Sequence, residues 1–292
     1  FEENGTNVAT RYTVGFGDTD AAFAGADYTR REFFRAHRHT AVPMETRGVV
    51  AEWDAAAGRL IVNGATKVTF FNRRALAAMM QMPESAIDLM ELDVGGGFGV
   101  RGEFYPEDFL IPFAARKLGR PIKWIEDRLE HMQATNHSRE IDCELEIACR
   151  RDGTIIGLRG KIFGDMGAYT RTNSGVVPAK AAQFLHGPYR IPTIKIEVSA
   201  FMTSKTPVGT YRAPGRFESN FFRERLIDMA ARDLGLDPVA IRRKNLVAVD
   251  EMPYSIGRLV PYETETAFDS GDYQAALDKC LEAFGWEEKV KL

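Results

Sequence analysis

The feature that most constrains this chain is the sequence Gly-Gly-Gly-Phe-Gly at positions 95–99. It follows the apolar and acidic segment 89–94 and precedes a helix-like segment, 103–118. Glycine lacks Cβ, so it adopts positive φ readily and lets a ligand approach backbone N–H groups closely. Since ordinary turns need only one or two glycines, this run predicts a turn that cradles an anion or a metal-oxo ligand. A plain strand-to-helix turn is the alternative.

Composition places the chain among ordinary globular proteins and predicts two compact units rather than one. It has 292 residues, of which 45% are hydrophobic, with 38 basic and 41 acidic residues mixed along its length. The formal net charge of −3 offers no basic field for nucleic acid, and no apolar run reaches the length of a membrane span. We expect a soluble, cytoplasmic chain. Because it opens on Phe1 rather than Met, we expect a segment of a longer protein.

The three cysteines do not form a metal or cluster motif. Cys143, Cys149 and Cys280 make no Cys-x-x-Cys pair and no group with the five histidines. An iron–sulfur or zinc site within the chain is therefore disfavoured, and free core thiols are expected. Cys143 and Cys149 alternate in phase with apolar residues of segment 141–147, which predicts that both are buried on one face of a strand.

Hairpin patterns outnumber crossover patterns along the sequence. Two short strands, two longer strands and one further strand are predicted, with helices that end at glycine or before proline. The predicted strands are 48–53, 59–62, 141–147, 154–163 and 197–202, and the predicted helices are 72–81, 107–118 and 218–234. This order favours an α+β fold in which mostly antiparallel sheets pack against helices.

Part of the glycine run also fits a dinucleotide-binding fingerprint. Residues 97–102 read Gly-Phe-Gly-Val-Arg-Gly, which matches G-x-G-x-x-G, and the predicted strand 121–125 ends at Glu126 and Asp127, where a ribose-binding acid would fall. The chain then turns to hairpins instead of continuing the alternation of strand and helix. A nicotinamide-dependent dehydrogenase is therefore kept as the alternative.

A second constellation lies at 206–218, where prolines and glycines stiffen a loop that carries Tyr211, Arg212 and Arg216 before a helix. An ordered loop that offers guanidinium and backbone N–H donors suits an anionic or oxo-bearing group. The other interpretation is a helix-entry loop whose arginines pair with Glu218 or Glu224.

Five motifs in order carry a resemblance to a known family. They are accompanied upstream by Pro43-Met44-Glu45 and downstream by Asp269-Ser270-Gly271-Asp272-Tyr273. The five motifs are DVGGGFG (93–99), DMGAY (165–169), GPYRIP (187–192), TYRAPGR (210–216), and LGLDP (234–238) with RKNL (243–246). With these motifs the chain resembles, over nearly its whole length, the large molybdenum-binding subunits of the xanthine dehydrogenase, aldehyde oxidase and aerobic carbon monoxide dehydrogenase family.

The resemblance implies a molybdopterin-dependent oxidoreductase that hydroxylates a C–H carbon of an aldehyde or N-heterocycle with oxygen from water. It implies a molybdopterin cytosine dinucleotide cofactor, with FAD and [2Fe-2S] clusters on partner subunits or domains, and no direct protein ligand to the metal. The residues implied to contact the cofactor are Gly96, Gly97, Phe98, Gly99 and Ala213, while Tyr211 and Arg212 are implied to act at the active site.

Three departures from the family limit this transfer: the residues at positions 67 and 213, and a catalytic glutamate that belongs to a segment beyond Leu292. Relatives often carry Gln where this chain has Lys67, so a cation would replace an amide beside the cofactor, or the side chain points elsewhere. Ala213 stands where carbon monoxide dehydrogenases carry a copper-binding cysteine, which disfavours that substrate. Lys180 falls where some purine-oxidising relatives carry a substrate-contacting arginine, although a solvated lysine is equally expected.

The family's catalytic glutamate belongs to a segment beyond Leu292, so we expect this chain alone to be inactive and free of cofactor. The expected units are 1–130 with the glycine run, 131–248 with the arginine-bearing loop, and an extension, 249–292. A non-catalytic assembly scaffold is a further alternative to an enzyme. The identity of the substrate and the oligomeric state cannot be read from the sequence.

Overall fold

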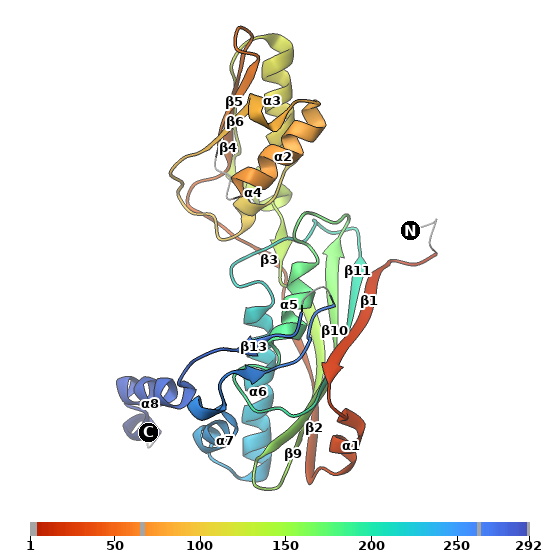
Figure 1. Cartoon of the computed structure of the whole chain (residues 1–292), viewed down its shortest axis with the longest axis vertical. Coiled ribbons are helices and arrows are strands. Elements are labelled where there is room, and N and C mark those ends of the chain that lie inside the picture. Colours follow the sequence, from red (N-terminus) through yellow and green to blue (C-terminus); the bar gives the residue numbers. More distant parts are fainter. Residues whose placement is uncertain (1–4, 65–67, 262–263, 291–292) are drawn as a thin grey trace.

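The computed structural model describes residues 5–64, 68–261 and 264–290 and shows an elongated molecule with two lobes (Figure 1). The smaller lobe is built on a four-stranded sheet and the larger lobe on a five-stranded sheet. Two segments, 37–47 and 126–140, connect the lobes. Within these connections the short strands β3 (His39–Thr40) and β8 (His137–Ser138) pair with each other.

The small lobe follows the predicted pattern closely. Its strand order is β6-β5-β4-β7, and only β5 and β6 pair in parallel. Helices α2 and α3 supply Leu76, Ala77 and Ala115 to its core, and Gly119 ends α3 in the left-handed conformation, as its sequence position predicts. The bounds are β4 (Gly48–Asp54), β5 (Arg59–Gly64), α2 (Thr69–Met80), β6 (Ile87–Glu91), α3 (Pro106–Leu118) and β7 (Ile122–Ile125).

The large lobe places a sheet of order β1-β11-β10-β9-β2 against helices α5 and α6. Strands β10 and β11 pair in parallel and the other neighbours are antiparallel. The side of β9 that faces the helices is apolar, and alternation buries Leu145, Cys143 and Cys149 there. The bounds are β1 (Val8–Phe16), β2 (Tyr28–Ala36), β9 (Ile141–Cys149), β10 (Ile155–Gly167), α5 (Val176–Phe184), β11 (Ile194–Met202) and α6 (Arg216–Leu234).

Smaller elements surround these two sheets. Helix α1 follows β1, α4 lies in the second connection between the lobes, and α7 to α9 follow α6 (Figure 1). They are α1 (Thr19–Ala24), α4 (Arg128–Ala134), α7 (Pro238–Asn245), β12 (Tyr254–Ser255), β13 (Ala267–Phe268), α8 (Tyr273–Phe284) and α9 (Trp286–Lys289).

The predicted α+β class with mostly antiparallel sheets is confirmed, and so is the burial of Cys143 and Cys149. Cys280 is exposed on α8, so the expectation of a core thiol is wrong there. Strands β1 and β2 precede residue 37, yet they pair with β11 and β9. The sheet order thus counts against assigning residues 8–36 to the expected unit 1–130, and the division into three units stays a prediction.

The topology of the small lobe also excludes the dinucleotide-binding interpretation. Strand β6 precedes the glycine run and β7 follows α3, but these strands lie at opposite edges of the sheet. A dinucleotide-binding unit would continue a parallel sheet through that crossover, whereas β7 pairs antiparallel with β4. The glycine run is therefore not part of a dinucleotide-binding unit.

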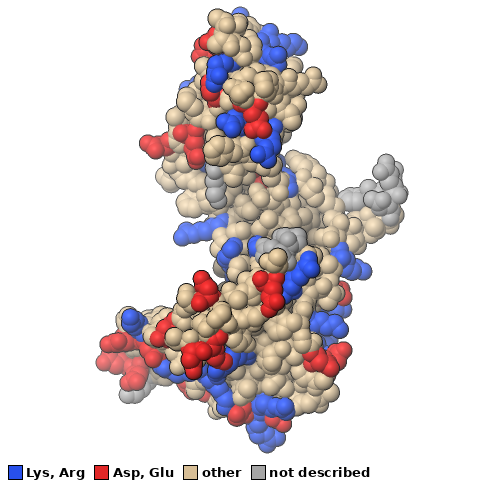
Figure 2. Space-filling view, in the orientation of Figure 1, with Lys and Arg blue, Asp and Glu red and all other residues tan. Residues whose placement is uncertain are grey.

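No helix in the described residues is long and apolar enough to cross a membrane. On the face shown in Figure 2, basic and acidic side chains are interspersed over both lobes. This pattern agrees with the even mixture of charges along the sequence.

Candidate functional site

Two loops that are distant in sequence meet between the lobes: the glycine turn, 95–99, and the arginine loop, 206–218. The backbone N–H of Arg212 donates to the carbonyl oxygen of Phe98 at 2.8 Å. Gly99 has φ 113°, and a Cβ placed on it would lie 2.5 Å from the carbonyl oxygen of Thr210. Glycine at position 99 is therefore required both by the backbone conformation and by the approach of the second loop.

The glycine turn presents unused backbone donors. Among the described residues, the N–H groups of Gly96, Gly97, Phe98 and Gly99 form no hydrogen bond. The turn is partly open to solvent, since Gly95 and Phe98 are exposed, Gly96 and Gly97 are half-buried and Gly99 is buried. Consecutive N–H groups in such a turn form a concave site that favours a negatively charged or oxo-bearing group.

Glu45 and Arg101 stabilise the glycine turn through hydrogen bonds to its backbone. The Glu45 carboxylate accepts from the N–H of Gly95 at 2.7 Å, and Arg101 Nε donates to the carbonyl oxygen of Gly96 at 2.6 Å. Arg101 Nη2 also donates to the carbonyl oxygen of Glu45 at 2.9 Å. Burial lowers the pKa of Arg101. The motif at 43–45, which the sequence marks upstream, thus supports the turn.

Arg139 and Glu218 hold the arginine loop. Arg139 Nη1 lies 3.1 Å from both carboxylate oxygens of Glu218, and Arg139 Nη2 donates to the carbonyl oxygen of Arg212 at 2.6 Å. The guanidinium carbon lies 4.9 Å from the ring centroid of Tyr211 and 4.6 Å from that of Phe217. The partner of Glu218 is therefore Arg139 and not an arginine of the loop.

A buried polar chain links the two lobes beneath the loops. The Tyr105 hydroxyl lies 2.7 Å from the carbonyl oxygen of Val100 and 2.5 Å from Asn136 Oδ1, and Asn136 Nδ2 donates to the carbonyl oxygen of Thr210 at 3.1 Å. Glu103 accepts from the N–H of Thr210 at 3.4 Å, and burial raises the pKa of Glu103. The residues from 100 to 105 thus fix the arginine loop to the base of the glycine turn.

Backbone strain is concentrated at this site. Phe98, Arg139, Glu140 and Ala213 have φ values of 53°, 69°, 36° and 55°, in the left-handed region that glycine favours. Among the described non-glycine residues, only Gln81, which ends α2, shares this conformation. Each such residue costs about 1–3 kcal/mol, and strained residues of this kind cluster where function requires them.

Comparison with known proteins assigns the family of this site. Residues 1–246 match the model of the family described as "Molybdopterin cofactor-binding domain". The chain belongs to this family. Neither the family nor the relatives found support a nicotinamide-dependent dehydrogenase or a scaffold without cofactor, so these alternatives are set aside.

Relatives of this molybdopterin-binding chain are oxidoreductase subunits. The gamma subunit of the 6-hydroxypseudooxynicotine dehydrogenase complex of Paenarthrobacter nicotinovorans is 41% identical over 97% of the chain and 35% of its own length. The carbon monoxide dehydrogenase large chain of Hydrogenophaga pseudoflava is 34% identical over 93% of the chain and 34% of its own length. The present chain thus spans about a third of the length of these relatives.

A solved structure agrees with the fold. Quinoline 2-oxidoreductase from Pseudomonas putida 86 superposes with a TM-score of 0.90 at 33% identity, covering 98% of this chain and 36% of that one. The resemblance stated from the motifs is therefore confirmed by both sequence and fold.

The described residues of the site fit a molybdopterin cofactor. Four N–H groups without hydrogen bonds are donors that suit a cofactor rich in oxygen and nitrogen acceptors, and they lie beside exposed Arg212, whose guanidinium has no partner among the described residues. No group of three or more His, Cys, Asp or Glu in that part of the chain could hold a metal ion directly. The polar groups that this site presents in the described residues are therefore hydrogen-bond donors rather than a set of metal ligands.

The structure places most of the predicted site residues together. Tyr211 is half-buried with its ring edge-on to His39 at 5.1 Å, and Arg212 and Ala213 are exposed beside the glycine turn. Lys180 lies on α5, where its Nζ donates to Gln183 Oε1 at 2.7 Å and its backbone packs against Gly215. Lys67 lies outside the described residues.

Sequence reasoning missed Arg139, Asn136 and His39. Their roles depend on contacts with the arginine loop, which is distant along the chain. Arg139 and Arg212, for example, are 73 positions apart. The presence of an arginine two residues before strand 141–147 is, by itself, no signal for such a contact.

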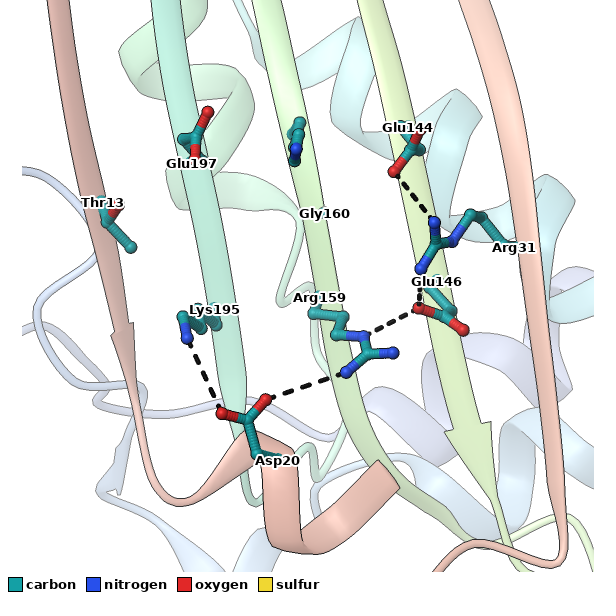
Figure 3. A pocket seen from close by; sticks show the side chains of 10 residues that line it. Thr13, Asp20, Arg31, Glu144, Glu146, Arg159, Gly160, Lys195 and Glu197 are labelled. Atoms are coloured by element: carbon teal, nitrogen blue, oxygen red, sulfur yellow. Dashed lines mark hydrogen bonds and ion pairs between the residues drawn. The ribbon is translucent and has the colours of Figure 1, made fainter. Parts of the chain in front are cut away.

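A separate hollow of about 300 Å³ lies on the open face of the large sheet, away from both loops (Figure 3). Arg159 Nε lies 2.7 Å from Glu146, Arg31 lies 3.0 Å from Glu146, and Asp20 approaches Arg159 at 3.8 Å and Lys195 at 3.9 Å. These charges pair with one another across neighbouring strands, as Figure 3 shows. None of the predicted site residues lines this hollow.

Proposed function

We propose that this chain forms part of the cofactor-binding region of a molybdenum hydroxylase, which oxidises a C–H carbon of its substrate with oxygen from water. The observation that carries the proposal is the row of unused N–H groups at Gly96, Gly97, Phe98 and Gly99, placed against the arginine loop. Donors fixed before a ligand arrives need no reorganisation when charge develops on it.

Each predicted residue has a role in this proposal. Gly96, Gly97, Phe98 and Gly99 bind and orient the cofactor through their N–H groups, and Ala213 lines the same space. Tyr211 and Arg212 face the substrate, where the exposed guanidinium of Arg212 stabilises negative charge that develops on it. The cofactor, when bound, supplies the two-electron oxidation. We propose that Lys67 also contacts the cofactor.

The substrate class proposed is an N-heterocycle or an aldehyde. Among the relatives, one is named for 6-hydroxypseudooxynicotine and one for quinoline, which favours the N-heterocycle. Ala213 has no thiol with which to bind copper, which argues against carbon monoxide.

We propose molybdopterin cytosine dinucleotide as the form of the cofactor, and FAD and [2Fe-2S] clusters on partner subunits as the route by which electrons leave. Support comes from relatives that are named as subunits or chains of larger enzymes. A cytoplasmic location stays a prediction.

Molybdenum and nucleotide analysis tests this proposal. The full-length protein is expressed with its neighbouring subunits in a host that makes the cytosine dinucleotide cofactor. We expect about one molybdenum and one cytidine monophosphate per chain after acid hydrolysis. Folded protein that contains neither would refute the proposed function and favour a scaffold, whereas guanosine monophosphate would correct only the form of the cofactor.

A further inference from the structure

Two adjacent residues between β8 and β9, Arg139 and Glu140, interact with opposite ends of the arginine loop. Arg139 contacts the middle and the end of the loop through Arg212 and Glu218, as described above. Glu140 contacts its start, because it pairs with Lys205, directly before the loop, and with Arg38. Arg38 Nη1 in turn donates to the carbonyl oxygen of Thr206 at 2.5 Å.

Arg139 and Glu140 both adopt the left-handed backbone conformation. Successive left-handed residues turn the chain sharply, so that the side chain of Arg139 enters the lobe interior while Glu140 reaches the opposite end of the loop. The conformation is unfavourable for non-glycine residues and persists only where the surrounding contacts compensate for it. The contacts that do so here are those with the arginine loop.

The ion pair of Arg139 with Glu218 is deeply buried. The two side chains are 5% and 0% exposed, and the guanidinium lies between the rings of Tyr211 and Phe217. A planar guanidinium can donate to a carboxylate and a carbonyl oxygen at once while stacking on rings, which the point charge of lysine cannot do. The site therefore selects arginine specifically.

We propose that Arg139 is a positioning residue that sets the path of the arginine loop, with Glu218 holding its guanidinium in place. Fixing the carbonyl oxygen of Arg212 orients the adjoining peptide groups, including the Arg212 N–H that donates to Phe98. Arg139 thereby aligns the arginine loop with the glycine turn. The effect on the cofactor rests on the proposed function, whereas the effect on the loop does not.

The variants Arg139→Lys and Glu218→Gln in the full-length protein test this inference. The matched control is Arg223→Lys, because Arg223 is also buried, pairs with Glu224 at 2.8 Å and donates to the carbonyl oxygen of Phe184 at 2.7 Å, away from the loop. Three quantities are measured: hydrogen exchange of the backbone amides of residues 210–213, molybdenum content per chain, and the electron paramagnetic resonance spectrum of the reduced molybdenum centre.

We expect Arg139→Lys and Glu218→Gln to accelerate hydrogen exchange at the amides of residues 210–213 roughly tenfold or more, to lower molybdenum content at least about twofold, and to shift the spectrum of the remaining molybdenum. Arg223→Lys should leave all three unchanged even if it lowers the melting temperature equally. Equal effects of Arg139→Lys and Arg223→Lys on all three would overturn the positioning role. Wild-type protein without molybdenum would instead refute the proposed function, and the exchange result would still decide whether Arg139 sets the loop.

Discussion

The glycine turn and the arginine loop meet at one site but are held by opposite means. The glycine turn depends on the absence of side chains, since Gly99 leaves room for the carbonyl oxygen of Thr210 and Glu45 holds Gly95 from near the surface. The arginine loop depends on a buried charge pair that lies beneath it. An added Cβ at Gly99 therefore tests the glycine turn, and a lost charge at Arg139 or Glu218 tests the arginine loop.

This difference explains where free donors are found. In the arginine loop, the carbonyl oxygen of Arg212 accepts from Arg139 and the N–H of Thr210 donates to Glu103. In the glycine turn, the Gly95 N–H donates to Glu45, whereas the N–H groups of residues 96–99 form no hydrogen bond in the described part of the chain. A rigid neighbour can thus support a turn whose own backbone remains available to a ligand.

The largest effect on stability is expected for Gly99→Ala, which changes a residue of the glycine turn itself. The added Cβ would meet the carbonyl oxygen of Thr210 at 2.5 Å in a residue with φ 113°. Strain and overpacking together should lower the free energy of unfolding by at least about 3 kcal/mol and separate the two loops. Thermal unfolding and molybdenum content of the full-length protein measure both effects.

Gly58→Ala is the matched control for this change. Gly58 also has a positive φ, of 64°, but a Cβ there would meet nothing within 4 Å. It should cost about 1 kcal/mol and leave molybdenum content unchanged. Equal effects of the two alanines would mean that the contact between the loops is unimportant.

A smaller effect is expected for Glu126→Gln, which acts on the segment that supports the glycine turn. Although burial would raise the pKa of Glu126, hydrogen bonds from His131 and Arg47 hold it at about 2, against an ordinary 4.5. The carboxylate thus adds stability that is fully present above pH 4.5 and is lost as pH falls toward 2, at most about 3 kcal/mol.

The variant should therefore lose about 2 kcal/mol at pH 7 and show a flatter decline of stability between pH 4.5 and pH 2. Denaturant unfolding at several pH values measures this, with exposed Glu52→Gln as control. Parallel pH profiles for Glu126→Gln and wild type would show that this ion pair does not support the turn.

The smallest effect on stability is expected for Arg212→Ala. Its guanidinium is exposed and has no partner among the described residues, so the free energy of unfolding should change by no more than about 0.5 kcal/mol. Turnover of the complete enzyme should nevertheless fall by at least about tenfold, because the charge stabilisation that we propose for Arg212 at the substrate would be lost. Comparable losses of turnover and stability would instead identify a structural arginine.

Strict alternation and helix-ending glycines made much of the fold predictable. Segment 141–147 and the helices that end at Gly119 and Gly235 lie where the sequence places them. Strand β2 escaped prediction because it carries Arg30 and Glu32 on the side that faces the helices, where Arg30 pairs with Asp233 of α6. A charged side chain that is neutralised by a distant partner can lie on the buried side of a strand, and it then breaks the alternation of apolar and polar residues by which a strand is predicted.

The site was predictable only in part. The composition of the glycine turn predicts a ligand-binding turn, and this stays a prediction, whereas the contact between Phe98 and Arg212 was not predicted from the sequence. The buried ion pair of Arg139 and Glu218 joins residues that are 79 positions apart, and no local sequence pattern predicts it. The suggested pairing of loop arginines with Glu224 is wrong, since Arg223 and Arg242 occupy that carboxylate.

The most direct test of the account is a crystal structure of the full-length protein with its cofactor bound. The account predicts that cofactor atoms accept hydrogen bonds from the N–H groups of Gly96 to Gly99, while the Arg212 N–H still donates to the carbonyl oxygen of Phe98. A cofactor bound elsewhere, with these N–H groups facing only solvent, would contradict it.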